Sequence, residues 1–92
     1  MKPNTQATNG SGTATTSFAQ VAPYSGTRDY ALIQNKGPED LYITVTDPNE
    51  TPDINLANIL VAGAVWEPYR APVGIISVAT STATASYVTL IS

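Results

Sequence analysis

The sequence has 92 residues, the length of one small domain. It contains no cysteine and no histidine, which removes disulfides, thiolate nucleophiles and the commonest general base. The 7 acidic and 4 basic residues give a net charge of −3, and so few scattered cations cannot neutralise the many phosphates of a nucleic acid. We therefore expect neither an enzyme nor a nucleic-acid-binding protein, and no cofactor.

The N-terminal residues 1–12 are small and polar. They lack the apolar centre of a secretory signal, and no stretch of the chain is apolar for long enough to span a bilayer. Residues of this kind bury too little apolar surface to offset chain entropy. The sequence predicts a flexible N-terminal arm over residues 1–12 and a single β domain over residues 13–92, made in the cytoplasm without a membrane contact.

The first half of the domain carries the strongest strand signals. Thr13–Ala22 is weakly β, and we expect an edge strand there, anchored by Phe18. Two apolar runs follow, within Arg28–Asn35 and within Asp40–Thr46. In the second run apolar residues alternate with tyrosine and threonine, the pattern of a strand with one buried face. Asn, Gly, Pro and Asp within residues 35–40 mark a chain reversal. We predict that these two strands pair as the central hairpin.

The second half adds shorter elements. Leu56–Val61 fits a short strand or one helical turn, and Val65–Tyr69 fits a short strand that a proline interrupts. Val73–Ala79 is nearly all apolar, as in a strand buried on both faces, and Ala85–Ile91 alternates to the end of the chain. A total of about six to seven short strands predicts an all-β fold, either a small antiparallel β-sandwich or a jelly-roll-like barrel.

The loop Asp47–Asn55 contains several oxygen ligands at close spacing: Asp47, Asn49, Glu50 and Asp53. Such a set can hold a hard cation, but the spacing departs from the calcium-binding loop and no glycine provides its sharp turn. We expect a solvated acidic loop in preference to a metal site. The acceptor pattern for glycosylation at Asn49 is interpreted as a chance match, because no secretory signal precedes it.

Catalytic groups are scarce in the sequence. Without histidine, only a serine–lysine pair is left for nucleophilic catalysis, and Lys36 lies in a predicted loop where it keeps its proton. Arg28 and Arg70 stand near acidic residues, so we expect surface ion pairs for both. Aromatic residues are enriched at protein interfaces. The candidate partner-binding residues are Trp66, Tyr69, Arg70, Asp47 and Asp53.

Several of these segments together resemble small accessory virion proteins of tailed bacteriophages, especially capsid decoration (cement) proteins. The resemblance covers about residues 28–92, and the N-terminal arm lies outside it. In that group a strand ending in Ile-Gln-Asn pairs with a strand of the type Leu-Tyr-Ile-x-Val, and a Leu-x-x-Gly approach leads to an aromatic strand. The matching positions are Leu32–Asn35, Leu41–Val45, Leu60–Gly63 with Trp66, and Val73–Ile91.

The resemblance implies a β-sandwich or jelly-roll module on the outside of a phage head. Its partners would be the major capsid protein or other virion proteins, it would form trimers, and it would stabilise contacts between capsomers. Two alternatives stay open. One is a carbohydrate-binding or host-attachment module that uses Trp66 and Tyr69 as a platform, and the other is a tail or collar component of the virion.

Overall fold

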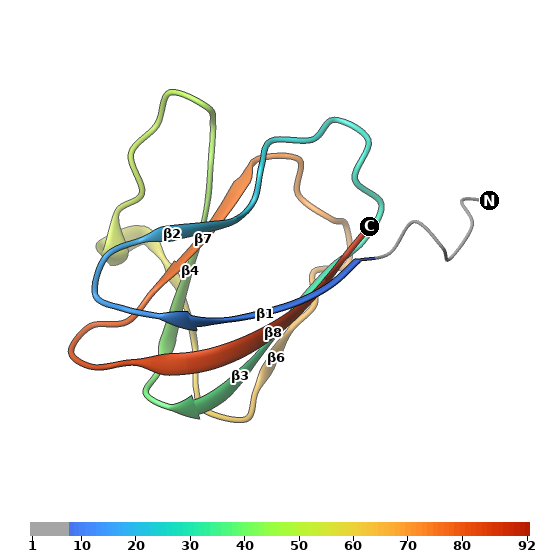
Figure 1. The fold of residues 1–92 in the computed structure, drawn as a ribbon. Coiled ribbons are helices and arrows are strands. Elements are labelled where there is room, and N and C mark those ends of the chain that lie inside the picture. Colours follow the sequence, from blue (N-terminus) through green and yellow to red (C-terminus); the bar gives the residue numbers. More distant parts are fainter. Residues whose placement is uncertain (1–7) are drawn as a thin grey trace.

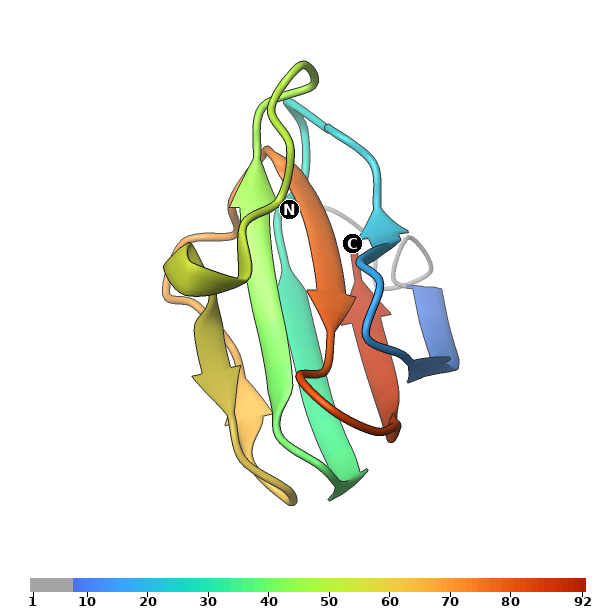
Figure 2. The same ribbon diagram turned by 90° about the vertical axis from the view of Figure 1, so that its left-hand side faces the viewer.

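The computed structural model describes residues 8–92, which form two antiparallel sheets of four strands each (Figure 1). The strand order is β1-β8-β3-β6 in one sheet and β2-β7-β4-β5 in the other, and the sheets face each other as a sandwich (Figure 2). The chain changes sheet at every connection except that from β4 to β5, as in an eight-stranded jelly roll. The strands are β1 (Thr8–Ala14), β2 (Ala19–Ala22), β3 (Ala31–Pro38), β4 (Leu41–Thr46), β5 (Asn58–Leu60), β6 (Val65–Trp66), β7 (Ile75–Ala79) and β8 (Ala85–Ile91).

The predicted all-β fold is confirmed. Of the two alternatives it is the small antiparallel sandwich, and it has eight strands where the sequence predicts six to seven. The predicted final strand coincides with β8, and the strand predicted to be buried on both faces contains β7, of which all but the first residue is buried. Within residues 8–92 the helical element is the 3-10 turn η2 (Ile54–Leu56), and none of the helices there is long and apolar enough to cross a membrane. The open alternative at Leu56–Val61 is therefore a strand, β5, that follows a helical turn.

The core lies between the two sheets and is built from alternating residues of the central strands. On β3 every second residue is buried, from Ala31 to Gly37, because successive side chains of a strand point to opposite faces. Leu41 and Ile43 of β4 enter the core from the opposite sheet. The largest fully buried apolar side chains are Ile33, Leu41, Ile43, Ile76 and Val78.

The predicted hairpin of Arg28–Asn35 with Asp40–Thr46 is wrong. The segments do form β3 and β4, but the two strands belong to different sheets, and the chain crosses the sandwich between them. Each strand is central in its own sheet: β3 lies between β8 and β6, and β4 lies between β7 and β5. Turn-forming residues signal a change of direction, and they do not distinguish a hairpin from a crossing between sheets.

Asn35, which the sequence places at the start of the turn, lies inside strand β3 and stabilises the crossing from β3 to β4. This residue is fully buried within β3, and its Nδ2 donates to Leu60 O at 2.7 Å and to Glu39 O at 2.8 Å. Its Oδ1 accepts a hydrogen bond of 2.7 Å from the amide of Gly37, which has a positive φ of 82° at a bulge in the β3–β8 register. The amide side chain thus connects β3, the crossing to β4 and the end of β5.

The N-terminal prediction also needs correction. The segment Thr13–Ala22 is not one strand, since β1 ends at Ala14 and β2 starts at Ala19 in the other sheet. Strand β1 begins at Thr8, so residues 8–12 pair with β8 and are part of the sheet, while residues 1–7 lie outside the described part of the chain. Strand β1 contributes one small apolar residue to the core, Ala14, and at Gly12 the ring of Tyr87 from β8 lies against bare backbone.

Candidate functional site

Arg28 is a structural residue, which corrects the predicted surface ion pair. It is buried, and its guanidinium donates to three backbone carbonyls: Gly74 O at 3.0 Å, and Pro72 O and Pro23 O. Burial lowers the pKa of Arg28 from its ordinary value. The side chain therefore ties the connection before β3 to the connection before β7.

An aromatic and acidic hollow lies where the chain enters β3 and leaves β6. It measures about 400 Å³ and is lined by Asp29, Tyr30, Glu67, Pro68 and Tyr69. The Tyr30 hydroxyl donates to Glu67 Oε2, and this hydrogen bond, followed by desolvation and by the carboxylate charge, raises the pKa of Tyr30. Tyr30 therefore remains a neutral donor, and Tyr69 stands fully exposed beside it. We name these five residues the tyrosine hollow.

Two other predicted partner-binding residues, Trp66 and Arg70, lie near this hollow but do not line it. Trp66 is half-buried, and its side chain packs against the apolar core. Arg70 is exposed in the connection that follows Tyr69, and it does not line the tyrosine hollow. Of the three, Tyr69 is thus the side chain that presents a whole aromatic ring to the surroundings.

The acidic loop predicted at Asp47–Asn55 folds back over the outer face of β4 (Figure 2). The amide of Glu50 donates to Asp47 O at 3.0 Å, and Glu50 Oε1 accepts from the amide of Asp47 at 3.1 Å. Asp53 caps η2, since its Oδ1 accepts a hydrogen bond of 2.9 Å from the amide of Asn55. The acids are therefore held in defined positions by the backbone of their own loop.

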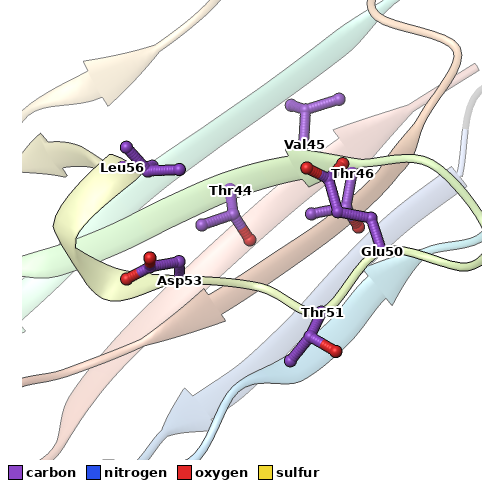
Figure 3. A pocket seen from close by; sticks show the side chains of 7 residues that line it. All are labelled: Thr44, Val45, Thr46, Glu50, Thr51, Asp53 and Leu56. Carbon is purple, nitrogen blue, oxygen red and sulfur yellow. The ribbon is translucent and has the colours of Figure 1, made fainter.

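Beneath this loop lies a cavity of about 80 Å³ (Figure 3). Thr44 and Thr46 face the loop from β4, and Glu50, Thr51 and Asp53 close the cavity from the opposite side. We name this space the threonine cavity; its lining residues are Thr44, Val45, Thr46, Glu50, Thr51, Asp53 and Leu56. Of the predicted site residues it contains Asp53 and not Asp47.

Sequence reasoning missed Thr44. Its side chain is 5 % exposed, and its Oγ1 is buried without a hydrogen-bond partner. In the strand pattern a threonine between Ile43 and Val45 is typical of the solvent-facing member of an alternating pair, so the pattern carries no sign of the covering loop. Within residues 8–92 no group of three or more acidic, histidine or cysteine residues could hold a metal ion.

A third surface follows the chain through β5 and β6, the edge strands on one side of the sandwich (Figure 2). Four of its apolar side chains are exposed, Leu56 at 78 %, Ile59 at 59 %, Val61 at 56 % and Val65 at 47 %, while Leu60 points into the core. We name this segment, residues 56–65, the apolar edge. Edge strands offer unpaired backbone groups, and exposed apolar side chains beside them favour contact with another protein.

Comparisons with known proteins add one structural likeness. No protein-family model matches the chain, and no curated protein matches it. A solved structure, described by the words "Bacillus endospore appendages form a novel family of disulfide-linked pili", is similar with a TM-score of 0.61 at 12 % sequence identity. The match covers 94 % of this chain and 82 % of that chain. At this identity the likeness supports the fold.

Proposed function

We propose that this chain is a non-enzymatic structural virion protein, a capsid decoration protein that binds the outside of a phage head and stabilises contacts between capsomers. The apolar edge is the observation that carries the proposal. Isoleucine, valine and leucine side chains there are exposed beside two free strand edges. Covering such surface contributes roughly 25 cal/mol per Å² before the costs of association are subtracted.

The proposed partners are the major capsid protein and further copies of this chain in a trimer. A small jelly roll with its core closed and its edges uncovered suits a subunit that gains stability from its neighbours. The sequence resemblance to accessory virion proteins suggests the assembly, and the virion surface is accordingly the proposed location. The same resemblance admits a tail or collar position, which labelled particles viewed by electron microscopy distinguish from a position on the head.

The structural comparison offers a contrast in how subunits are linked. The pili named in that comparison are disulfide-linked. The present chain has no cysteine, so covalent links of that kind are not open to it. Assembly through strand edges and apolar side chains needs no thiol. The apolar edge therefore offers this cysteine-free chain a non-covalent way to bind its neighbours.

The test compares phage particles that carry the protein with particles assembled without it. We expect the depleted particles to assemble and to release their DNA at a lower temperature, and we expect added purified protein to restore the original temperature. A dye-release melting curve measures both. Equal release temperatures with and without the protein would count against a stabilising role.

A matched pair of variants locates the contact. Ile59→Lys places a charge on the apolar edge, and Ser81→Lys places the same charge in the exposed connection between β7 and β8. Both sites are exposed, so both variants should fold. We expect Ile59→Lys to lose binding to empty shells in a sedimentation assay and Ser81→Lys to retain it. If Ile59→Lys keeps binding and Ser81→Lys loses it, the apolar edge is not the surface that contacts the shell.

The tyrosine hollow favours a second candidate, a carbohydrate-binding or host-attachment module. Sugars stack on exposed aromatic rings and bond to carboxylates, and here Tyr69 stands exposed beside Glu67. A glycan array with the wild type and Tyr69→Ala tests this candidate. Binding that Tyr69→Ala abolishes would support it, and an array without any signal would remove it. Trp66→Ala is the poorer variant, since Trp66 packs against the core.

A further inference from the structure

The threonine cavity contains a polar group that the fold leaves unpaired. Thr44 is more than nine-tenths buried, and its hydroxyl has no hydrogen-bond partner. An unpaired buried hydroxyl destabilises a protein, and valine has nearly the shape of threonine without this cost. The stability of the fold therefore does not explain why this residue is a threonine. A ligand that forms a hydrogen bond with the threonine hydroxyl would explain it.

The chemistry of the lining selects the ligand. Glu50 and Asp53 each use one carboxylate oxygen to accept a backbone amide, at 3.1 Å and 2.9 Å, and each retains its second oxygen. Carboxylates only accept hydrogen bonds. Among the described residues that line the cavity none is basic, so their negative charge is not balanced from within the lining. Leu56, which is largely exposed, adds an apolar wall.

We propose that the threonine cavity receives a lysine side chain of the protein partner. The ammonium would donate to Asp53 and to the Thr44 hydroxyl, the methylene stem would lie along Leu56, and Glu50 at the other end of the cavity would add to the negative charge. An ammonium carries three donors and no acceptor, which complements this lining, and lysine stems readily cover apolar surface. The inference rests on the proposed structural role, because it names the residue type by which a protein partner is recognised.

A divalent cation matches the cavity less well than lysine does. Calcium takes about six to eight oxygen ligands, mostly carboxylates and carbonyls. The described residues bring together two acidic side chains here and no larger group of metal-ligating residues. An exposed leucine beside the carboxylates can pack against the methylene stem of a lysine, whereas it offers no ligand to a hydrated ion.

Entry needs only a local displacement. The Thr44 hydroxyl is closed off from solvent, so the loop above it must move outward before a ligand can reach it. Residues 47–53 belong to no strand and form no rung of a sheet ladder. The loop can therefore shift without breaking a hydrogen bond between strands.

The experiment titrates the isolated protein with small probes and follows its backbone amides by NMR. The probes are N-acetyl-lysine amide, the uncharged N-acetyl-norleucine amide and calcium chloride at constant ionic strength. We expect the lysine probe alone to shift the amides of residues 44–46 and 50–56 in a saturable manner. Thr44→Val and Asp53→Asn should each weaken that binding about tenfold, the usual effect of losing one charged hydrogen bond.

Asp40→Asn is the matched control, because it removes one exposed carboxylate from the crossing between β3 and β4, outside the cavity. It should leave the titration unchanged. Equal shifts with the norleucine probe, saturable shifts with calcium in place of lysine, or no shift with any probe would overturn the proposal. These titrations contain no capsid, so they test the lysine site separately from the proposed function. If the protein binds the lysine probe but does not bind empty shells, the lysine site is supported and the proposed function is rejected.

Discussion

A single hydroxyl at Thr44 illustrates how a site can reduce stability. If the fold alone is considered, Thr44→Val removes a buried polar atom without a partner and keeps the side-chain shape. We expect the variant to raise the free energy of unfolding by about 1 kcal/mol. Urea denaturation measures the change, with the exposed Thr51→Val as the neutral control. A loss of stability in Thr44→Val would show that the hydroxyl has a partner in solution.

Asn35 is the residue on which the crossing between the sheets depends most. In Asn35→Ala the carbonyls of Glu39 and Leu60 and the amide of Gly37 lose their side-chain partner. Each buried group left unpaired costs roughly 1–3 kcal/mol, so we expect a loss of at least about 3 kcal/mol, a large share of a domain's stability.

Thermal and urea unfolding measure the Asn35→Ala loss, and Asn58→Ala on β5 is the exposed control with the same deletion. A loss below about 1 kcal/mol, the net value of one hydrogen bond, would show that water replaces the side chain. The sequence pattern places Asn35 at the start of a turn. A local pattern cannot show that its side chain reaches a carbonyl 25 residues away.

Strand β1 shows how an element can form with a single small apolar side chain of its own, Ala14. At Gly12 an added Cβ would lie 2.6 Å from the hydroxyl oxygen and 2.8 Å from the Cζ of Tyr87, so the ring of Tyr87 must move. We expect Gly12→Ala to destabilise the protein by about 1 kcal/mol and to loosen β1 locally.

Hydrogen exchange of the β1 amides measures this effect. Gly26→Ala is the control, because an added Cβ there meets nothing within 4 Å and the residue has no positive φ. Faster exchange in β1 of the Gly12 variant alone is the expected result. Equal exchange in both variants would show that Tyr87 does not hold this edge.

The sequence reveals the strands of the molecule better than their partners. Alternation locates β4 and β8, and apolar runs locate β3 and β7, because both patterns are visible in a short window. Sheet membership depends on contacts between distant segments, such as β1 with β8, and no local pattern contains them. The polar stretch at residues 8–12 therefore has the composition of a free arm, although it pairs through its backbone along the last strand.

The residues of the candidate sites are also only partly predictable from the sequence. Residue type identifies Tyr69 and Asp53, and both line hollows. It misses their companions Tyr30 and Thr44, since each becomes part of a site only when another segment folds over it or beside it. Residue type thus finds the chemically distinctive members of a site, and topology supplies the others.

At the scale of the whole molecule, the two sheets should unfold together. Trp66 belongs to the sheet of β3, and it packs against the core that Leu41 and Ile43 fill from the other sheet. Its fluorescence therefore reports the contact between sheets, whereas far-ultraviolet circular dichroism reports the strands themselves. We expect the two urea transitions to coincide, as they do for a cooperative single domain.

The same shared core predicts how a local change spreads. Asn35→Ala should lower the midpoints of both transitions by the same amount, because Asn35 connects β3 of one sheet to β5 of the other. Refolding should take about milliseconds to seconds, since strands that pair over long sequence distances form slowly. Stopped-flow fluorescence measures the rate. A tryptophan transition that precedes the loss of strand signal would show instead that the sheets separate before they unfold.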